Sequence, residues 1–222
     1  MSQQYRDYVI DNLFVEDFFE KKNDDSAYVL EETESGGECR LYFKTLSPKS
    51  IAILNVDGKK TQENDKKRNL TQFNFLKSDG KLSLRKRVDH IVFEEREDSF
   101  WIAHLLEMKS SVTCAEKWTE IKGKFRASYL LVQALCAMLH IKLMEVRMYT
   151  SYESVALSYA PENLVFRKPR VGAVAADLSK EWSGEKFVLQ FGDDCRLPFL
   201  HTPIHVTRNE KNILEGQFNV DQ

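Results

Sequence analysis

Several features that would assign a chain to a special class are scarce or missing in this sequence. It has only four cysteines in 222 residues, none in a Cys-x-x-Cys pair: Cys39, Cys114, Cys136 and Cys195. This spacing excludes the disulfide framework of a small secreted domain and the ligand pairs of a zinc knuckle, and it indicates reduced thiols. No run approaches the roughly 18 apolar residues of a membrane span. The amino terminus lacks the basic start and apolar run of a secretion signal, so we expect a cytoplasmic protein without a membrane segment.

A large net charge is missing as well, because 32 basic residues nearly balance 34 acidic ones. With 42% hydrophobic and 30% charged residues, the composition is typical of a globular domain with a sizeable core. The average conceals an asymmetry. Residues 1–40 carry 11 acidic and four basic side chains, whereas residues 59–87 carry ten basic and three acidic ones. The basic block can bind phosphate groups, or it can be an ordinary solvated loop.

Hydrophobic patterning predicts an α/β fold, with a mixed central β-sheet flanked by helices. Helices are expected at 6–22 and from 114 to His140, the second one capped by Thr113 and Glu116. Strands are expected at 27–33, 39–45, 50–56, 82–95, 100–112, 143–150, 154–159 and 186–191, with a polar, lysine-rich loop at 57–80. We expect residues 1–160 to form the core, with 161–222 as a C-terminal extension of unknown role packed on it.

The most informative residues are Asp89 and the Glu107-Met108-Lys109 segment. Because side chains alternate along a strand, Glu107 and Lys109 share one face at the end of a very apolar strand. Charges placed there are costly unless they are paired or bind a charged ligand. A hairpin turning near 97–98 would bring Asp89 opposite 106–107. Two carboxylates and a main-chain carbonyl suit Mg²⁺ or Mn²⁺, and a nearby lysine can hold or deprotonate an attacking water.

At these residues the sequence resembles the PD-(D/E)XK nuclease superfamily, with its restriction-endonuclease-like αβββαβ core. Asp89 matches the first acid of the motif, Glu107 the second and Lys109 the lysine, while Val88 replaces the proline of the family name. The resemblance covers about residues 80–150. It implies a Mg²⁺-dependent nuclease, acting on DNA in preference to RNA, in which Asp89, Glu107 and the Met108 carbonyl hold the metal and Lys109 serves the water.

The same resemblance suggests further site residues. Some members place a glutamine on the second core helix, for which Gln133 is the candidate, and some use an acid of the first helix as a metal ligand, for which Glu20 is the candidate. Phosphate contacts are expected from the basic block and the helix border, at Lys86, Arg87, Lys122 and Arg126. A homodimer is left open.

Other interpretations remain. The fold can serve as a catalytically inactive binding or regulatory module. Asp89 can be an exposed member of a salt bridge at the strand end, or, if it lies far from Glu107, the domain can be an unrelated interaction module. Zinc at Cys195, His201 and His205 is disfavoured by Pro203 and the missing fourth ligand. No Walker loop, G-x-G-x-x-G or G-x-S-x-G motif is present.

Overall fold

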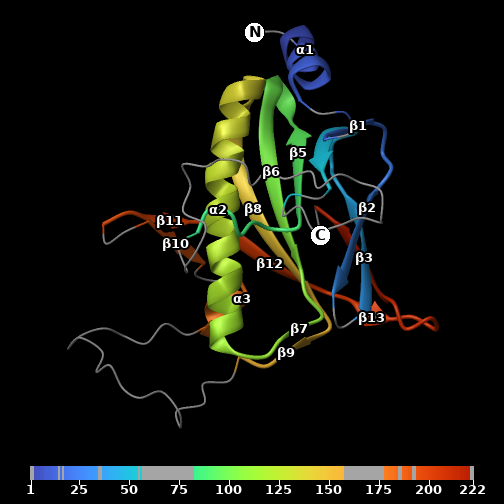
Figure 1. Ribbon diagram of the computed structural model, residues 1–222, viewed down its shortest axis with the longest axis vertical. Helices are drawn as coiled ribbons and strands as arrows, with labels where there is room; N and C mark the ends of the chain where they lie inside the picture. The colour runs from blue at the N-terminus through green and yellow to red at the C-terminus, as the bar shows by residue number, and fades with distance from the viewer. Residues whose placement is uncertain are drawn as a thin grey trace.

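Two β-sheets stacked face to face, with helices on the outer face of the larger one, make up the architecture (Figure 1). The computed structural model describes residues 3–14, 16, 18–34, 37–54, 56, 83–157, 178–184, 187–191 and 194–220. The helices are α1 (Gln3–Leu13), α2 (Ala115–Leu139) and α3 (Leu178–Trp182). No helix in these ranges is long and apolar enough to cross a membrane.

The larger sheet has six strands in the order β1-β4-β5-β6-β8-β12. Its members are β1 (Glu20–Asn23), β4 (Lys49–Ile53), β5 (His90–Glu95), β6 (Phe100–Met108), β8 (Lys142–Tyr152) and β12 (Leu200–His205). The strands from β1 to β6 pair antiparallel, whereas β8 runs parallel to both β6 and β12. The expected α/β class with a mixed sheet is therefore confirmed.

A second sheet has four strands in the order β13-β14-β3-β2. Its members are β2 (Tyr28–Glu34), β3 (Gly37–Lys44), β13 (Thr207–Arg208) and β14 (Leu214–Asn219). Two short pairs complete the described strands: β7 (Ser111–Val112) with β9 (Ser154–Val155), and β10 (Val188–Gln190) with β11 (Arg196–Pro198). A 3₁₀ turn at Glu97–Ser99 joins β5 to β6.

The core has two layers because β6 is buried on both faces. Ala103 and Leu105 pack toward the helices, in the cluster that contains Phe125 of α2. Leu106 and Met108 pack toward the smaller sheet. This is the arrangement expected for a central strand of near-continuous apolar sequence.

Helix α2 runs along one face of the larger sheet. The sequence predicts the end of this helix correctly but not its capping residue. At its start, Cys114 is the capping residue and no side-chain capping hydrogen bond forms, so the capping box predicted at Thr113 and Glu116 is wrong. At its end, His140 takes the left-handed conformation, with φ 51° and ψ 43°, which stops the helix where the sequence predicts.

The predicted helix over 6–22 is wrong in its second half. Helix α1 ends at Leu13, and residues from Glu20 onward form the edge strand β1 paired with β4. Between them Phe14, Phe18 and Phe19 contact one another, with ring centroids 4.7–5.4 Å apart. This aromatic cluster and the strand pairing are tertiary interactions that override the local helical periodicity.

The predicted strand at 82–95 is also too long, since within the described residues 83–95 only His90–Glu95 is strand. The loop at 57–80 lies outside the described residues, as do residues 158, 159 and 186 of two predicted strands.

The C-terminal part of the chain supplies strands to both sheets. Strand β12 pairs with β8, and β14 pairs in parallel with β3. Pro203 lies in β12, where an edge position tolerates a residue without an N–H donor. The segment from residue 178 onward therefore completes both layers of the core. The four cysteines are free thiols, two of them buried.

Candidate functional site

Asp89 and Glu107 lie side by side at the same end of two neighbouring strands. Strands β5 and β6 pair antiparallel with His90 opposite Leu106, so the residue before β5 falls beside Glu107. The register predicted from the hairpin is confirmed. Both side chains are buried, Asp89 at 1% and Glu107 at 0% exposure, which contradicts the alternative of an exposed Asp89.

Main-chain contacts hold Asp89 in place. Its Oδ2 atom accepts a hydrogen bond from the N–H of Met108 at 2.7 Å. The preceding residue is fixed to α2, because the N–H of Val88 donates to Ser128 Oγ at 3.0 Å. The irregular segment before β5 is thus tied both to the end of β6 and to the helix above it.

A buried lysine of α2 joins the two carboxylates. The Nζ atom of Lys124 lies 2.6 Å from Glu107 Oε1 and 3.6 Å from Asp89 Oδ1. Lys109 reaches the same Glu107 oxygen at 2.9 Å and donates a hydrogen bond to the Met108 carbonyl at 3.0 Å. Two ammonium groups therefore face the three oxygen donors that the sequence predicts as metal ligands.

Burial and mutual repulsion control the charge of the carboxylates. Burial, together with the neighbouring Asp89, raises the pKa of Glu107 to about 7 although both lysines oppose the shift. Burial also acts to raise the pKa of Asp89, but the charges of Lys124, Lys109 and His90, together with the hydrogen bond from Met108, outweigh it and hold that pKa below its ordinary value. Burial acts to lower the pKa of Lys124, whereas Glu107 and Asp89 more than compensate and keep it raised.

The donor set suits a hard divalent cation. The second oxygen of Glu107, Oε2, is buried and accepts no hydrogen bond within the described chain. Lys124 shows that a positive group fits between the carboxylates, since its ammonium contacts both. No three His, Cys, Asp or Glu side chains of the described residues converge as metal ligands. An ion here would rest on two carboxylates, a carbonyl and water, which is the usual Mg²⁺ arrangement.

Lys124 is the site residue that sequence reasoning missed. It lies on the buried face of α2 together with Ile121, Phe125 and Ser128. A lysine at helical spacing within an apolar face is the signal that would have identified it, because such a charge requires a buried partner.

The structure does not bring Gln133 or Glu20 to this site. Gln133 lines an open groove of about 810 Å³ beside Leu143 and Val146. Val146 pairs with Ala103, four strand positions from Glu107, or roughly 13 Å at about 3.3 Å per residue. Glu20 belongs to the edge strand β1 rather than to a helix, and it lies 3.7 Å from Lys22.

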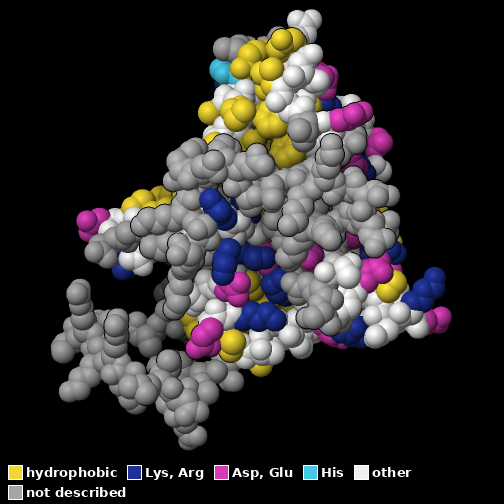
Figure 2. Space-filling view, in the orientation of Figure 1, with side chains coloured by type: hydrophobic (Ala, Val, Ile, Leu, Met, Phe, Trp, Pro, Cys, Tyr) yellow, Lys and Arg dark blue, Asp and Glu magenta, His cyan; other side chains and the backbone are white. Residues whose placement is uncertain are grey.

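The predicted phosphate-binding residues differ in how accessible they are. Lys86 is exposed and lies 4.0 Å from Glu120, while Arg126 is half-buried. Lys122 makes a 2.7 Å ion pair with Glu181 of α3, and Arg87 is only 3% exposed, which takes it out of reach of a phosphate backbone. Figure 2 shows Lys and Arg side chains near the middle of the face on which α2 lies, with acidic side chains among them. Residues 59–82 of the basic block lie outside the described residues.

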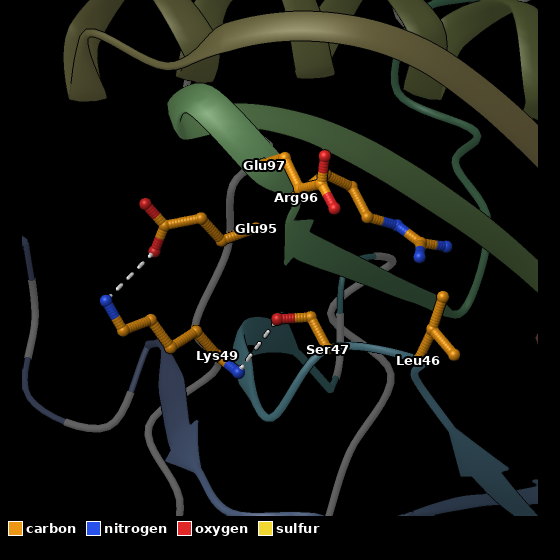
Figure 3. Close-up of a pocket in the computed structure, with 6 residues that line it drawn as sticks. All are labelled: Leu46, Ser47, Lys49, Glu95, Arg96 and Glu97. Carbon is orange, nitrogen blue, oxygen red and sulfur yellow. Dashed lines mark hydrogen bonds and ion pairs between the residues drawn. The ribbon is translucent and has the colours of Figure 1, made fainter.

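A second hollow, of about 320 Å³, lies at the other end of β5, lined by Leu46, Ser47, Lys49, Glu95, Arg96 and Glu97 (Figure 3). Both of its basic side chains already have acidic partners. Lys49 lies 3.8 Å from Glu95, and Arg96 lies 3.3 Å from Glu94.

His201, one of the two histidines of the alternative zinc site, already uses both ring nitrogens in other contacts. His201 is buried, its Nδ1–H donates to the Trp182 carbonyl at 2.8 Å, and its Nε2 lies 3.1 Å from Thr150 Oγ1. His205 and Cys195 are exposed. With both ring nitrogens bonded, His201 has no atom left for a metal.

Comparison with known proteins identifies no relative: no family model, curated protein or solved structure matches this chain.

Proposed function

We propose that this protein is a Mg²⁺-dependent phosphodiesterase that hydrolyses nucleic acid, DNA in preference to RNA. The observation that carries the proposal is that Asp89 and Glu107, buried at the ends of adjacent strands, contact one ammonium group between them. Mn²⁺ is the expected substitute for Mg²⁺, because both prefer carboxylate, carbonyl and water oxygens.

The order of elements supports a restriction-endonuclease-like core. Helix α1, the antiparallel strands β4, β5 and β6, helix α2 and strand β8 follow the αβββαβ order along the chain, with β1, β2 and β3 inserted after α1. Asp89 directly precedes β5, Glu107 and Met108 end β6, and Lys109 is the next residue, with the short strand β7 between this segment and α2.

Asp89, Glu107 and the Met108 carbonyl are the groups that would hold the metal. When bound, the ion would neutralise charge developing on the phosphate and acidify a water. Asp89 has a second task, because its hydrogen bond to the Met108 N–H fixes the Glu107–Met108 peptide, which directly precedes the carbonyl proposed as the third ligand. Lys109, held by the Met108 carbonyl, would orient the attacking water with its ammonium group.

Phosphate contacts outside the reacting group are proposed for Lys86 and Arg126. Lys86 has a side chain 60% exposed, only three residues before Asp89. Binding through such contacts should weaken steeply with salt, because each neutralised phosphate releases counterions.

Cleavage of labelled single-stranded DNA, duplex DNA and RNA tests the proposal. We expect wild-type protein with Mg²⁺ or Mn²⁺ to cut at least one of them, and a chelator to stop the reaction. Glu107→Gln keeps the shape of the side chain but removes its charge, so it should abolish cleavage. Absence of cleavage of all three substrates in both metals would contradict the enzymatic proposal.

A specific observation favours a second candidate, an inactive nucleic-acid-binding module. Lys109 and Lys124 pair with Asp89 and Glu107, so the ionised carboxylates have cationic partners without any metal. A buried network of this kind can serve structure alone. Salt-dependent DNA binding that is indifferent to divalent ions, without cleavage, would select this candidate.

A further inference from the structure

The ammonium group of Lys124 occupies the position between the carboxylates at which a metal ion would have to bind. Its ammonium group contacts Glu107 Oε1 at 2.6 Å and Asp89 Oδ1 at 3.6 Å, which are oxygens of the two proposed carboxylate ligands. Its side chain is only 11% exposed, and it projects from the middle of α2 rather than from a loop. The contact is therefore part of the packed interior.

A divalent ion and this ammonium group cannot share the two carboxylates without strong repulsion. Charges of the same sign a few ångströms apart repel, and they do so more strongly in a poorly solvated interior than in water. Lys109 also contacts Glu107 Oε1 and the Met108 carbonyl, but it comes from the residue that directly follows β6 and makes no bridge between the two carboxylates. Lys124 comes from the opposing helix and bridges both acids.

We propose that Lys124 is a built-in competitor for the metal site, whose ammonium must leave the carboxylates before a divalent ion binds. This inference rests on the proposed metal site. It adds that the ammonium group of Lys124 occupies the metal site in the metal-free protein. The affinity for a metal ion therefore depends partly on the strength of the Lys124 contacts. It also predicts that metal binding exposes a lysine that is otherwise buried.

Chemical labelling of the wild-type protein tests the exposure directly. Acetic anhydride modifies accessible amines, and mass spectrometry gives the acetylated fraction of each lysine. We expect Lys124 to be protected without metal and its labelling to rise at least about threefold with saturating Mn²⁺. Lys142, which is exposed at the opposite end of β8, is the internal control and should label equally in both conditions. Unchanged protection of Lys124 with Mn²⁺ bound would overturn the inference.

Metal affinity provides a second and independent measurement. Lys124→Met removes the competing charge at nearly constant side-chain length, and calorimetry should show Mn²⁺ binding at least about tenfold tighter than in wild type, since no ion-paired ammonium has to be displaced. Lys142→Met is the matched control and should bind like wild type. Should Lys124→Met fail to fold without metal, Lys124→Gln retains a donor for Glu107 and is measured instead.

The outcomes separate this inference from the proposed function. Equal Mn²⁺ affinity in wild type and the Lys124 variants overturns the competitor role but leaves the metal site intact. No Mn²⁺ binding in any of them overturns both. Tighter binding in the variants without cleavage of nucleic acid supports the competitor role and overturns the phosphodiesterase proposal.

Discussion

Asp89 Oδ2 accepts a hydrogen bond from the main-chain N–H of Met108 at 2.7 Å. Through this contact a side chain outside β5 fixes the peptide unit that joins Glu107 to Met108. Asp89 therefore combines two roles that different substitutions can separate. Its charge belongs to the proposed metal site, and its hydrogen bond belongs to the fold.

Asp89→Asn and Asp89→Ala should separate these roles. Asparagine keeps an oxygen that accepts the Met108 N–H, so we expect a stable fold with metal affinity reduced about tenfold or more. Alanine leaves the N–H unsatisfied and removes a partner of Lys124, so the free energy of unfolding should fall by about 2–5 kcal/mol. Urea unfolding and Mn²⁺ calorimetry measure the two effects. Equal stability of the two variants would contradict the structural role of the hydrogen bond.

Lys109→Met should lower the single-turnover rate of cleavage by roughly 10²–10⁴-fold, which is the usual contribution of a group that positions or deprotonates a reacting water. Lys109 is not a proposed metal ligand, so Mn²⁺ affinity should stay at or above the wild-type value. The rate is measured with saturating Mn²⁺ on whichever substrate the wild type cuts. A full wild-type rate in this variant would exclude Lys109 from the chemistry.

His201 should make the fold sensitive to acid. Burial lowers its pKa to about 4, against an ordinary value of 6.5, and the rings of Trp118, Trp182 and Phe187 surround it. Below pH 6.5 His201 becomes protonated in the unfolded chain but stays neutral in the folded protein until the pH approaches 4. Stability is therefore lost between about pH 6.5 and pH 4, by up to roughly 3 kcal/mol.

Urea unfolding at pH 7 and pH 4.5 measures this loss, and carboxylates elsewhere contribute to it as well. His201→Gln isolates the histidine, because it can keep polar contacts to Thr150 and Trp182 but does not titrate. The variant should show a smaller difference between the two pH values than wild type. The same slope in both proteins would exclude His201 as a source of acid sensitivity.

The central hairpin was predictable because its determinants are local. The mostly apolar stretch from Ala103 to Met108 is typical of a buried strand, and a short turn fixes the register that brings Asp89 beside Glu107. The end of α2 near His140 follows from the end of its apolar periodicity. These features require no contact between distant parts of the chain.

Features that depend on distant partners could not be predicted in the same way. Strand β12 carries Pro203 and no clear alternation, and it becomes a strand through its pairing with β8. Glu20 follows a helical pattern in sequence, yet its segment pairs with β4. Lys124 was visible only as a lysine within an apolar stripe, and its significance depends on carboxylates 17 and 35 residues away.

Three buried side chains, Glu94, His104 and Tyr149, are linked by hydrogen bonds on the face of β6 opposite to Glu107. They offer a control for the metal site. His104 Nε2–H donates to Glu94 at 2.9 Å, and its Nδ1 lies 3.1 Å from the Tyr149 hydroxyl. Tyr149→Phe should cost about 1 kcal/mol of stability, the usual value of one buried hydrogen bond. It should leave Mn²⁺ affinity unchanged. A clear loss of affinity in this variant would show that Mn²⁺ affinity falls when the protein is destabilised, even if the metal site itself is not altered.

The most direct measurement for the whole account is a calorimetric titration of Mn²⁺ into wild-type protein and Glu107→Gln. Glutamine has the size of glutamate and can still contact Lys124 and Lys109, while it cannot supply the charge that a divalent ion requires. We predict one bound ion in the wild type and at least about a tenfold loss of affinity in the variant. Equal titrations of the two proteins, or no binding by the wild type, would contradict a metal site at Glu107.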